Sequence, residues 1–512
     1  MINKTKKTLC FMLALIMLLS SAACSESTEN AETDSTPVSD AVSAETENTE
    51  TEAVEEKLLP DLSPDLNYGG SEIRIMEHPV GAGDWSDWGS RDLYAEELSG
   101  EPINDSVFER NSYVEEELNV DINIIQVADM PGAIKQQATA GTGDYHVSTA
   151  RIQSLPSTVT GGYLLNLYDV NNVDLEKPWY DAQCIAEASL YDMLFYVTGS
   201  MIILDDDATG AMVFNKQLIT DHNLESPYTY VSEGKWTLDR LEELADVVDS
   251  DLNGNGQVDI EGDRFGILWQ NDAIISFMHG GGTRIVSKNS EGEPEFVFNT
   301  ENTINLMDKL DSFMFRPELV QNMHKHNNIY SDIYAGECAI FKQNNALFMW
   351  LRMRVAENLR DMEADFGIIP VPKLTEEQPN YYSTVNKYTA GSICIPNDGS
   401  LDLDMTGAVI ELMSAEGHYG LREAYYETNL GTKISRDPES TQMLDIIMES
   451  RVYDTGEIYS IAGFADRLYT LASGTQIGVA TLIKQNEKSF SKLLEKSFIK
   501  PLKEIAEQRK AQ

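Results

Sequence analysis

The chain has 512 residues and a formal net charge of −46, from 84 acidic and 38 basic side chains. An acidic surface of this strength repels nucleic acids, so DNA- and RNA-binding classes are excluded. The length also exceeds what one hydrophobic core usually supports, which predicts more than one folded lobe.

The first 23 residues have the pattern of a secretory signal peptide. Lys4, Lys6 and Lys7 precede an apolar run, Leu9–Leu19, and small residues follow. The run is shorter than the ~20 residues that a membrane span needs. We therefore expect residues 1–23 to direct export, the alternative being a truncated membrane anchor.

Cys24 follows directly after these small residues and resembles the acylated cysteine of a lipobox, although Ser21 stands where that motif has Leu. Acylation would anchor the protein to the extracytoplasmic face of the membrane without spanning it.

Residues 24–66 are predicted to form an acidic tether. Eleven carboxylates and no Lys, Arg or aromatic residue lie between Ser25 and Glu56. Such a composition cannot bury enough apolar surface to offset its ordering entropy, so the segment is expected to be disordered. A pro-segment that is later removed fits the same composition.

The rest of the chain is expected to fold. With the three signal lysines and the eleven tether carboxylates set aside, residues 57–512 retain a net charge of −38. Cys184, Cys338 and Cys394 are an odd set without close spacing, which predicts buried thiols and no disulfide framework.

Strands and helices alternate at the start of this part. Period-two alternation predicts strands at Ser71–Met76, Val120–Val127 and Tyr145–Ala150, with helices at Asp105–Leu118 and Ala133–Ala140. This order is typical of an α/β sheet with parallel strands, which binds ligands beyond the carboxyl ends of its strands.

Later segments continue the mixed pattern. The sequence predicts a helix at Trp236–Val248 and a strand at Phe265–Trp269. Short strands are expected at Ala339–Phe341, Phe366–Ile369 and Ser392–Ile395, and helices at Met405–Ser414, Thr441–Ser450 and Lys484–Gln508.

Six segments follow one another along the folded part: Glu109–Val120, Gly143–Val147, Gly162–Leu167 (GYLLNL), Val213–Lys216 (VFNK), Tyr228–Leu238 and Phe366–Lys373 (FGIIPVPK). In sequence and order they resemble the carbohydrate-type extracellular solute-binding proteins of ABC importers, a group related to maltose-binding proteins. The resemblance implies a two-lobed type II periplasmic-binding-protein-like α/β fold that closes on a ligand between its lobes.

The same resemblance implies domain boundaries and partners. One lobe would hold residues 67–178 and 335–398, and the other residues 179–334 and 399–512. The protein would be a monomeric, non-enzymatic protein that binds a small molecule, most simply a sugar, and delivers it to ABC permease subunits. No organic cofactor is expected.

A calcium loop is predicted in the second lobe. Asp251, Asn253, Asn255 and Asp259 supply side-chain oxygens at loop positions one, three, five and nine, and Gln257 offers its carbonyl at seven. This is the spacing that an oxygen-ligated Ca²⁺ loop requires. Position twelve is Gly262 instead of Glu, so a turn without an ion is the alternative.

Candidate ligand-binding residues combine flat aromatic faces with hydrogen-bonding groups, as a sugar requires. They are Trp85, Trp88, Arg151, Trp269, Gln270, Trp350 and Glu427. For each tryptophan, a place in the core is the alternative.

Other polar motifs are interpreted as structural. We expect Asp205–Asp207 to form a solvated turn, the alternative being a place facing the ligand cleft. His279 and His324–His326 are expected to lie in turns. The alternatives to a transport protein are an extracytoplasmic glycoside hydrolase, which needs a pair of carboxylates, and a glycan-capturing surface lipoprotein without a transporter.

Overall fold

A computed structural model describes residues 57–79, 89–248, 250–435, 437–474 and 478–511. The predicted signal peptide, Cys24 and the first part of the predicted tether lie outside these residues. The folded unit begins at Lys57. Leu62 and Leu66 already pack against a buried apolar cluster, so the end of the predicted tether belongs to the folded part.

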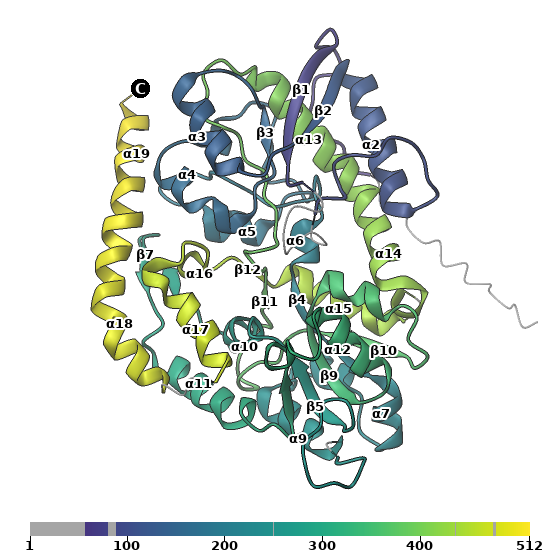
Figure 1. Cartoon of the computed structure of the whole chain (residues 1–512). Helices are drawn as coiled ribbons and strands as arrows, with labels where there is room; N and C mark the ends of the chain where they lie inside the picture. Colours follow the sequence, from purple (N-terminus) through teal and green to yellow (C-terminus); the bar gives the residue numbers. More distant parts are fainter. Residues whose placement is uncertain (1–56, 80–88, 249, 436, 475–477, 512) are drawn as a thin grey trace, which may run out of the picture. The chain divides into compact units, whose positions relative to one another are not determined.

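The first region is built on a three-stranded parallel sheet in the order β2-β1-β3. Its strands are β1 (Ser71–Glu77), β2 (Val120–Gln126) and β3 (Val147–Ser148). Its helices are α2 (Pro102–Leu118), α3 (Met130–Ala140), α4 (Pro156–Thr160) and α13 (Leu403–Tyr419). In Figure 1 these elements lie together, with α13 beside α2.

Local sequence explains why α2 and α3 begin and end where they do. The side chain of Glu101 accepts a hydrogen bond from the N–H of Asn104, and that of Asp129 from the N–H of Gly132. Each helix also has a proline in its first turn, where no N–H partner is needed. Asn119 and Gly141 end them in left-handed conformations.

The second region is built on a five-stranded mixed sheet in the order β10-β4-β9-β5-β8. Its strands are β4 (Gly210–Asn215), β5 (Phe265–Trp269), β8 (Val320–Asn322), β9 (Ala346–Arg352) and β10 (Phe366–Ile369). Its helices include α7 (Lys216–Asp221), α8 (Pro227–Ser232), α9 (Leu238–Val248), α10 (Ala273–Gly280), α11 (Glu301–Met314), α12 (Ile333–Lys342) and α15 (Pro438–Glu449).

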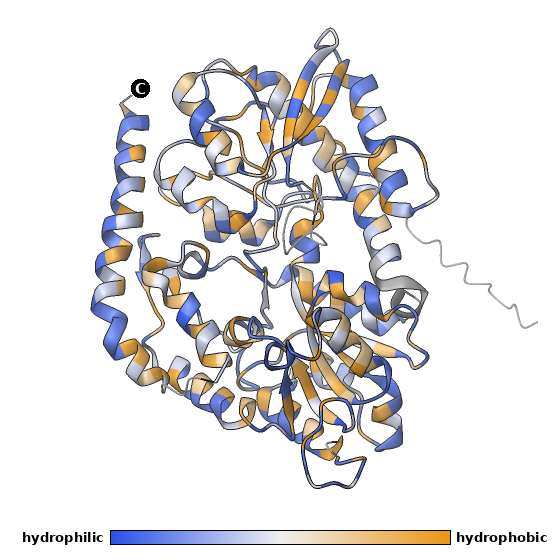
Figure 2. Ribbon diagram, viewed as in Figure 1, coloured by the Kyte–Doolittle hydropathy of each residue, from blue (hydrophilic) through white to orange (hydrophobic). Residues whose placement is uncertain are grey.

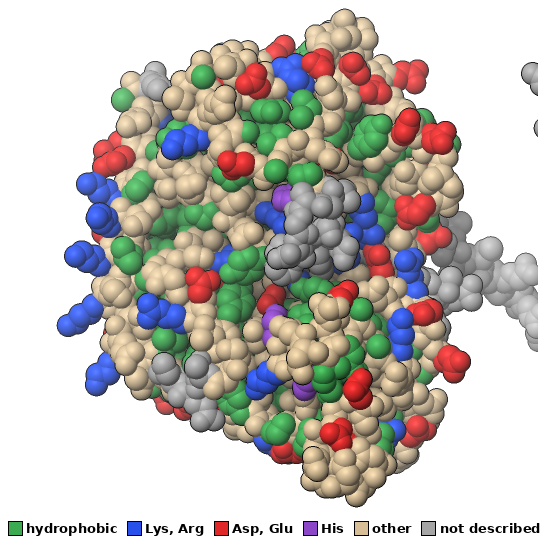
Figure 3. All heavy atoms as spheres, viewed as in Figure 1, with side chains coloured by type: hydrophobic (Ala, Val, Ile, Leu, Met, Phe, Trp, Pro, Cys, Tyr) green, Lys and Arg blue, Asp and Glu red, His purple; other side chains and the backbone are tan. Residues whose placement is uncertain are grey.

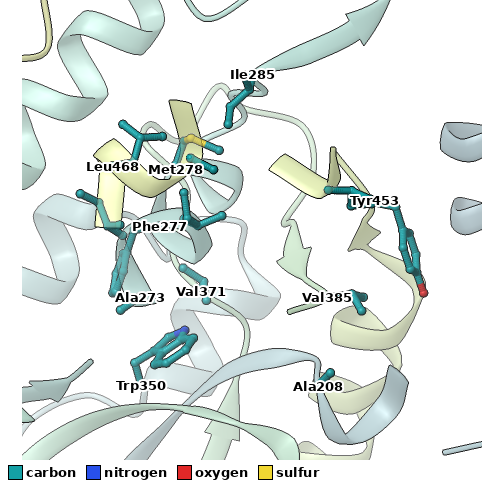
Figure 4. Close-up of a cluster of buried hydrophobic side chains, with 14 of the residues drawn as sticks. Ala208, Ala273, Phe277, Met278, Ile285, Trp350, Val371, Val385, Tyr453 and Leu468 are labelled. Atoms are coloured by element: carbon teal, nitrogen blue, oxygen red, sulfur yellow. The ribbon is translucent and has the colours of Figure 1, made fainter. Parts of the chain in front are cut away.

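Apolar residues fill the interior of this region. Figure 2 shows the strands of the five-stranded sheet as mainly hydrophobic, and every residue of β4, β5 and β9 is buried. A strand covered on both faces carries a continuous apolar run instead of an alternating one. Figure 4 shows Trp350 among other core side chains, including Ala273, Phe277 and Val371.

Several chain segments connect the two regions. They include α5 (Ala182–Ala188), α6 (Leu204–Asp207), the parallel pair β11 (Ser383–Thr384) and β12 (Arg451–Val452), and α14 (Leu421–Ser435). Residues 386–394 then run beside the first sheet, where Cys394 pairs with Ser148 and Ile393 with Val197. Predicted strand Ser392–Ile395 therefore has extended backbone with isolated bridges.

The C-terminal part is helical, as predicted. It contains α16 (Thr455–Ile458), α17 (Phe464–Ala472), α18 (Val479–Leu494), a π-helical turn η7 (Glu495–Ile499) and α19 (Lys500–Lys510). Helix α16 contacts a β-hairpin formed by β6 (Val286–Lys288) and β7 (Pro294–Phe296). Helix α18 contacts α11, and Arg509 of α19 pairs with Asp169 of the first region.

Two sequence-based expectations need correction. Residues 339–341 lie in helix α12, not in a strand, because Asp332 caps that helix by accepting from the N–H groups of Tyr334 and Ala335. The predicted lobe boundaries also place two segments differently from the structure: residues 335–398 were assigned to the first lobe and residues 399–512 to the second. Strands β9 and β10 belong to the second sheet, and α13 packs on α2 of the first region.

Within the described residues, no helix combines the length and the apolar character needed to cross a bilayer.

Candidate functional site

Three strands of the second sheet end at the same edge. Strands β8 and β9 both pair with β5 in parallel, so residues after Trp269, Asn322 and Arg352 lie close together. Their side chains are joined by hydrogen bonds: the amide of Asn322 donates to Asn271 Oδ1 at 2.9 Å, and the N–H of Asn271 donates to His324 Nδ1 at 3.2 Å.

Asp272 is the centre of a polar group at this edge, which we call the Asp272 group: Asp272, His324, Tyr334, Arg352, Asn386 and Tyr388. Asp272 Oδ2 accepts a hydrogen bond from the side-chain amide of Asn386 at 3.0 Å and lies 3.9 Å from Arg352 Nη1. Arg352 also donates to the hydroxyl of Tyr334 and stacks over its ring. An acid, a guanidinium, an amide and phenols thus meet in one place.

The connecting segment contributes an aromatic face. Tyr388 is partly exposed, and its ring centroid lies 5.9 Å from that of Tyr469. Its N–H donates to Asn386 Oδ1 at 3.0 Å, and its hydroxyl donates to Asp466 at 3.3 Å. Two tyrosine rings beside hydrogen-bonding groups are what a sugar ring needs, because it presents C–H faces and a rim of hydroxyls.

The first region reaches this segment through backbone pairing. The N–H of Ile152 donates to the carbonyl of Ala390, and that of Gln153 to the carbonyl of Lys387. Arg151, which follows strand β3, therefore lies beside the residues around Tyr388. Burial lowers the pKa of Arg151 and of His78, which follows β1.

Burial also sets the protonation of the Asp272 group. It lowers the pKa of His324, so the imidazole is neutral at pH 7 and its Nδ1 is available to accept from Asn271. Burial raises the pKa of Tyr334 to about 12, and burial together with Asp466 raises that of Tyr388. At neutral pH the group therefore offers neutral hydroxyls and a neutral imidazole around one charged pair.

The structure brings some predicted site residues here and not others. Arg151 lies beside the group. Gln270 is buried below the group and donates to Glu337 Oε1 at 2.6 Å. Glu427 is exposed on α14. Trp85 and Trp88 lie outside the described residues.

Trp269 and Trp350 are core residues here, the alternative that the sequence left open. Each is 1% exposed. The ring of Trp269 packs against Phe277 and Phe313, at 5.6 and 6.3 Å between centroids. Neither indole presents a face to a ligand in this structure. The large apolar surface of tryptophan favours such burial.

Sequence patterns gave only part of the Asp272 group. Asp272 follows the predicted strand Phe265–Trp269, so its place beyond a strand end was an available signal. Arg352 is the last residue of β9, but Asn386 and Tyr388 come from an irregular connection without periodicity. Their proximity depends on long-range folding.

The predicted turn at Asp205–Asp207 is instead a buried ion-pair cluster, and that expectation was wrong. Arg451 contacts Asp181 at 2.7 Å, Asp205 at 3.2 Å and Asp206 at 2.6 Å. Asp207 contacts Arg91 at 3.1 Å and Arg354 at 3.3 Å. Burial raises the pKa of Asp205, as does neighbouring Asp206, while Arg451 opposes the shift.

Two histidine expectations also change. His279 is fully buried at the end of α10, where Nδ1 lies 2.7 Å from the hydroxyl of Thr384 and Nε2 lies 3.4 Å from Asp454. It is a core residue and not part of a turn. His324 belongs to a short 3₁₀ helix, Met323–His326, and to the Asp272 group.

The predicted calcium loop has its oxygen-bearing side chains close together. The amides of Asn253 and Asn255 both contact Asp259 Oδ2, at 3.1 and 2.5 Å. Asp251 accepts from the N–H groups of Gly254 and Gly256. The fit is partial, because Asp263, the acid nearest to position twelve, accepts from two backbone N–H groups.

Within the described part of the chain, no three His, Cys, Asp or Glu side chains gather as a metal site, so the asparagines are needed for one.

A cavity of about 810 Å³ lies elsewhere. It is bounded by Tyr168, Tyr191 and Lys503 among others. Two of its cations are already neutralised, since Arg509 pairs with Asp169 and Lys503 with Glu293 at 2.7 Å. We therefore assign the candidate site to the Asp272 group, where both regions meet the connecting segment.

Comparisons with known proteins support the fold. No family model and no curated protein sequence matches the chain. Solved structures do match. Maltose-bound MalE3 from T. maritima is 12% identical with a TM-score of 0.52, covering 83% of this chain and 100% of that one.

Two further structures match at a TM-score of 0.54. A cyclo/maltodextrin-binding protein with maltotetraose is 12% identical and covers 83% of this chain and 97% of that one. UgpB from Mycobacterium tuberculosis, with glycerophosphocholine, is 13% identical and covers 84% and 99%. The chain therefore has the α/β type II fold of the maltose-binding-protein-like ABC solute-binding proteins.

Proposed function

We propose that this protein is the substrate-binding component of an ABC importer, capturing a sugar or oligosaccharide outside the membrane and delivering it to permease subunits. The observation that carries the proposal is the Asp272 group at the strand ends, within a fold whose solved examples are binding proteins. Solved examples of this fold hold maltose, maltotetraose or ribitol.

The chemistry of the group favours a polyhydroxyl ligand. The Asp272 carboxylate, 20% exposed, can accept hydrogen bonds from ligand hydroxyls, whereas Arg352 and Asn386 are buried and hold that carboxylate in place. Tyr388 and Tyr469 supply apolar faces for the C–H surface of a sugar. A charged ligand would instead need an excess of the opposite charge in the site, whereas here Asp272 and Arg352 balance each other.

Export and anchoring complete the proposal. The first 23 residues would be removed as a signal peptide, Cys24 would be acylated, and the acidic segment after it would hold the folded unit away from the bilayer. Asp251, Asn253, Asn255, Gln257 and Asp259 would hold a structural Ca²⁺, whose bound oxygens would rigidify that loop. The protein would act as a monomer without catalytic activity.

The test is a thermal melt of the chain from residue 24 onward, with Cys24→Ser, against maltose, maltotriose, maltotetraose, ribitol and a set of peptides. A ligand bound only by the folded state stabilises it by about 2.7 kcal/mol at a hundredfold excess over its Kd. We expect a shift with at least one sugar, which is then recovered intact.

Two outcomes would contradict this. Cleavage of the sugar would indicate the glycoside hydrolase instead. A shift with peptides and with no sugar would keep a binding role but remove the carbohydrate assignment.

A further inference from the structure

The C-terminal helices carry a charge opposite to that of the whole chain. Residues 479–510 contain eight basic and four acidic side chains, in a protein with a net charge of −46. Lys484, Lys488, Lys492, Lys496 and Lys500 recur at every fourth position, and we call them the lysine stripe. A row of blue side chains lines the edge of the molecule in Figure 3 where Figure 1 places α18 and α19.

Packing leaves the stripe facing solvent. Val479, Leu482, Phe490, Leu494 and Phe498 bury the other side of α18 and η7. All five stripe lysines are exposed, and Leu493 is exposed among them. From Lys484 to Lys500 the stripe covers 17 residues, or about 24 Å along a helix axis.

The π-helical turn keeps the last lysines near the same face. In an α-helix each four-residue step advances about 40° around the axis, so a long i, i+4 series drifts away from its starting face. The turn Glu495–Ile499 has wider hydrogen-bond rings and fewer degrees per residue, which reverses part of that drift before Lys500.

The stripe has little internal neutralisation. Among the described residues, no carboxylate lies within 4.0 Å of the ammonium groups of Lys484, Lys488, Lys492 or Lys496. Lys500 lies 3.7 Å from Glu504, and both are exposed. Arg316, which is partly exposed, differs because it contacts Glu242, Asp246 and Glu318.

We propose that the lysine stripe is a docking surface for the anionic phospholipid headgroups of the membrane that carries the importer. Headgroup phosphates complement a row of exposed ammonium groups, and exposed Leu493 can enter the interface. The proposal rests on the proposed export and anchoring, which keep the folded unit close to that membrane.

The expected binding is weak and depends on orientation. Each lysine near an anionic surface strengthens binding on the order of fivefold, and the attraction falls within a Debye length of about 8 Å at physiological salt. The remaining acidic surface is repelled, so only the stripe side can approach. Weak binding is sufficient for a tethered protein, because the lipid anchor already holds it at the membrane and raises the effective concentration of the stripe near the headgroups.

The experiment is vesicle co-sedimentation of the chain from residue 24 onward, with Cys24→Ser so that no acyl chain contributes. Vesicles contain phosphatidylglycerol with phosphatidylcholine, or phosphatidylcholine alone, at low and at high salt. The stripe variant is Lys484→Gln, Lys488→Gln, Lys492→Gln and Lys496→Gln. A control with the same charge change replaces four exposed lysines elsewhere: Lys57, Lys135, Lys235 and Lys325, each to Gln.

We expect binding to the anionic vesicles at low salt only. The stripe variant should bind at least about twentyfold more weakly, and the control should bind within about twofold of the parent chain. Equal loss in both variants, or no binding of the parent chain, would overturn the proposal.

Binding to a soluble polymer of glycerol phosphate, but not to vesicles, would overturn it in favour of a wall polymer. Both variants are also melted with the sugar. A sugar-induced rise in Tm shows that a variant is folded and still binds sugar, independently of whether it binds vesicles. A chain that binds vesicles but no sugar would retain the stripe and lose the proposed function.

Discussion

Two groups of aspartate and arginine in this protein have similar chemistry but different surroundings. Around Arg451, three carboxylates are held at 2.6–3.2 Å, and the side chains of Asp181 and Asp205 are 3% and 2% exposed. Around Asp272, the contacts are looser, with Arg352 at 3.9 Å, and the Asp272 side chain is 20% exposed. In the first group the carboxylates are enclosed by the residues that pair with them. In the second, the carboxylate of Asp272 remains partly accessible to solvent.

This difference separates stabilising from binding roles. A buried carboxylate must be paired, because an unpaired charge in the interior costs several kcal/mol. A partly exposed carboxylate can exchange water for a ligand hydroxyl without that cost. Residue type alone therefore does not mark a site, and exposure and contact geometry do.

The largest expected effect is on the buried group. Arg451→Met keeps most of the side-chain volume but leaves Asp181, Asp205 and Asp206 without their shared cation. We expect the free energy of unfolding to fall by about 3–5 kcal/mol, measured by urea denaturation.

Arg316→Met is the matched control, because Arg316 also contacts three carboxylates but on the surface. Its loss should stay within about 1 kcal/mol. Equal losses in the two variants would remove the distinction drawn between buried and exposed groups.

The second effect is on ligand affinity. Asp272→Asn replaces a charged acceptor with a neutral one, and hydrogen bonds to charged groups contribute about 1.5–3 kcal/mol. We expect the Kd for the sugar found in the thermal screen to rise by about tenfold to a hundredfold in calorimetric titration. The unfolding free energy should change by less than in Arg451→Met. An unchanged Kd would place the ligand elsewhere.

A third effect concerns the buried imidazole of His146. His146 is 6% exposed, and the N–H of Arg74 donates to its Nδ1 at 3.0 Å. Burial lowers the pKa of His146 to about 4, and Arg74 lowers it as well. The unfolded imidazole, with a pKa of about 6.5, then takes up a proton that the folded one excludes.

Stability from His146 is therefore complete above pH 6.5 and is lost as the pH falls toward about 4. Between pH 6.5 and 5 the loss reaches about 2 kcal/mol. His146→Gln, which retains an acceptor, should flatten this part of the stability profile in urea melts at several pH values. His222→Gln, at the end of α7, is the control. A profile unchanged by His146→Gln would exclude this origin.

The smallest effect concerns exposed carboxylates. If the Asp251–Asp259 loop binds Ca²⁺, millimolar calcium should raise Tm by a few degrees, consistent with about 1 kcal/mol of linkage. Asp259→Asn should abolish the response, because Asp259 is the acid that both Asn253 and Asn255 contact. A response that persists in Asp259→Asn would locate the ion elsewhere.

Local patterns predicted local structure well. The strand Phe265–Trp269 has the expected bounds, and Trp236 packs as expected, with its Nε1–H donating to the carbonyl of Pro370 at 2.9 Å. Cys184, Cys338 and Cys394 are buried free thiols. These features depend on periodicity and on side-chain hydrophobicity within a short window.

Long-range features escaped prediction. By sequence alone, Asp205–Asp207 resembles a polar turn. Its partners Arg451, Arg91 and Arg354 are distant in sequence, so only the folded structure shows the ion pairs. The lobe boundaries depend on which sheet β9 joins, and an apolar strand fits either sheet equally. Tyr388 lies in an irregular connection, so only the folded structure shows that it meets Asp272.

The measurement that tests the central claim most directly is hydrogen–deuterium exchange with and without the sugar found in the thermal screen. We predict protection of the backbone amides at residues 270–274 and 386–390, which carry Asp272 and Tyr388, and little change around the cavity bounded by Tyr191 and Lys503. Protection at that cavity, with no change at residues 270–274 and 386–390, would contradict the assignment of the binding site.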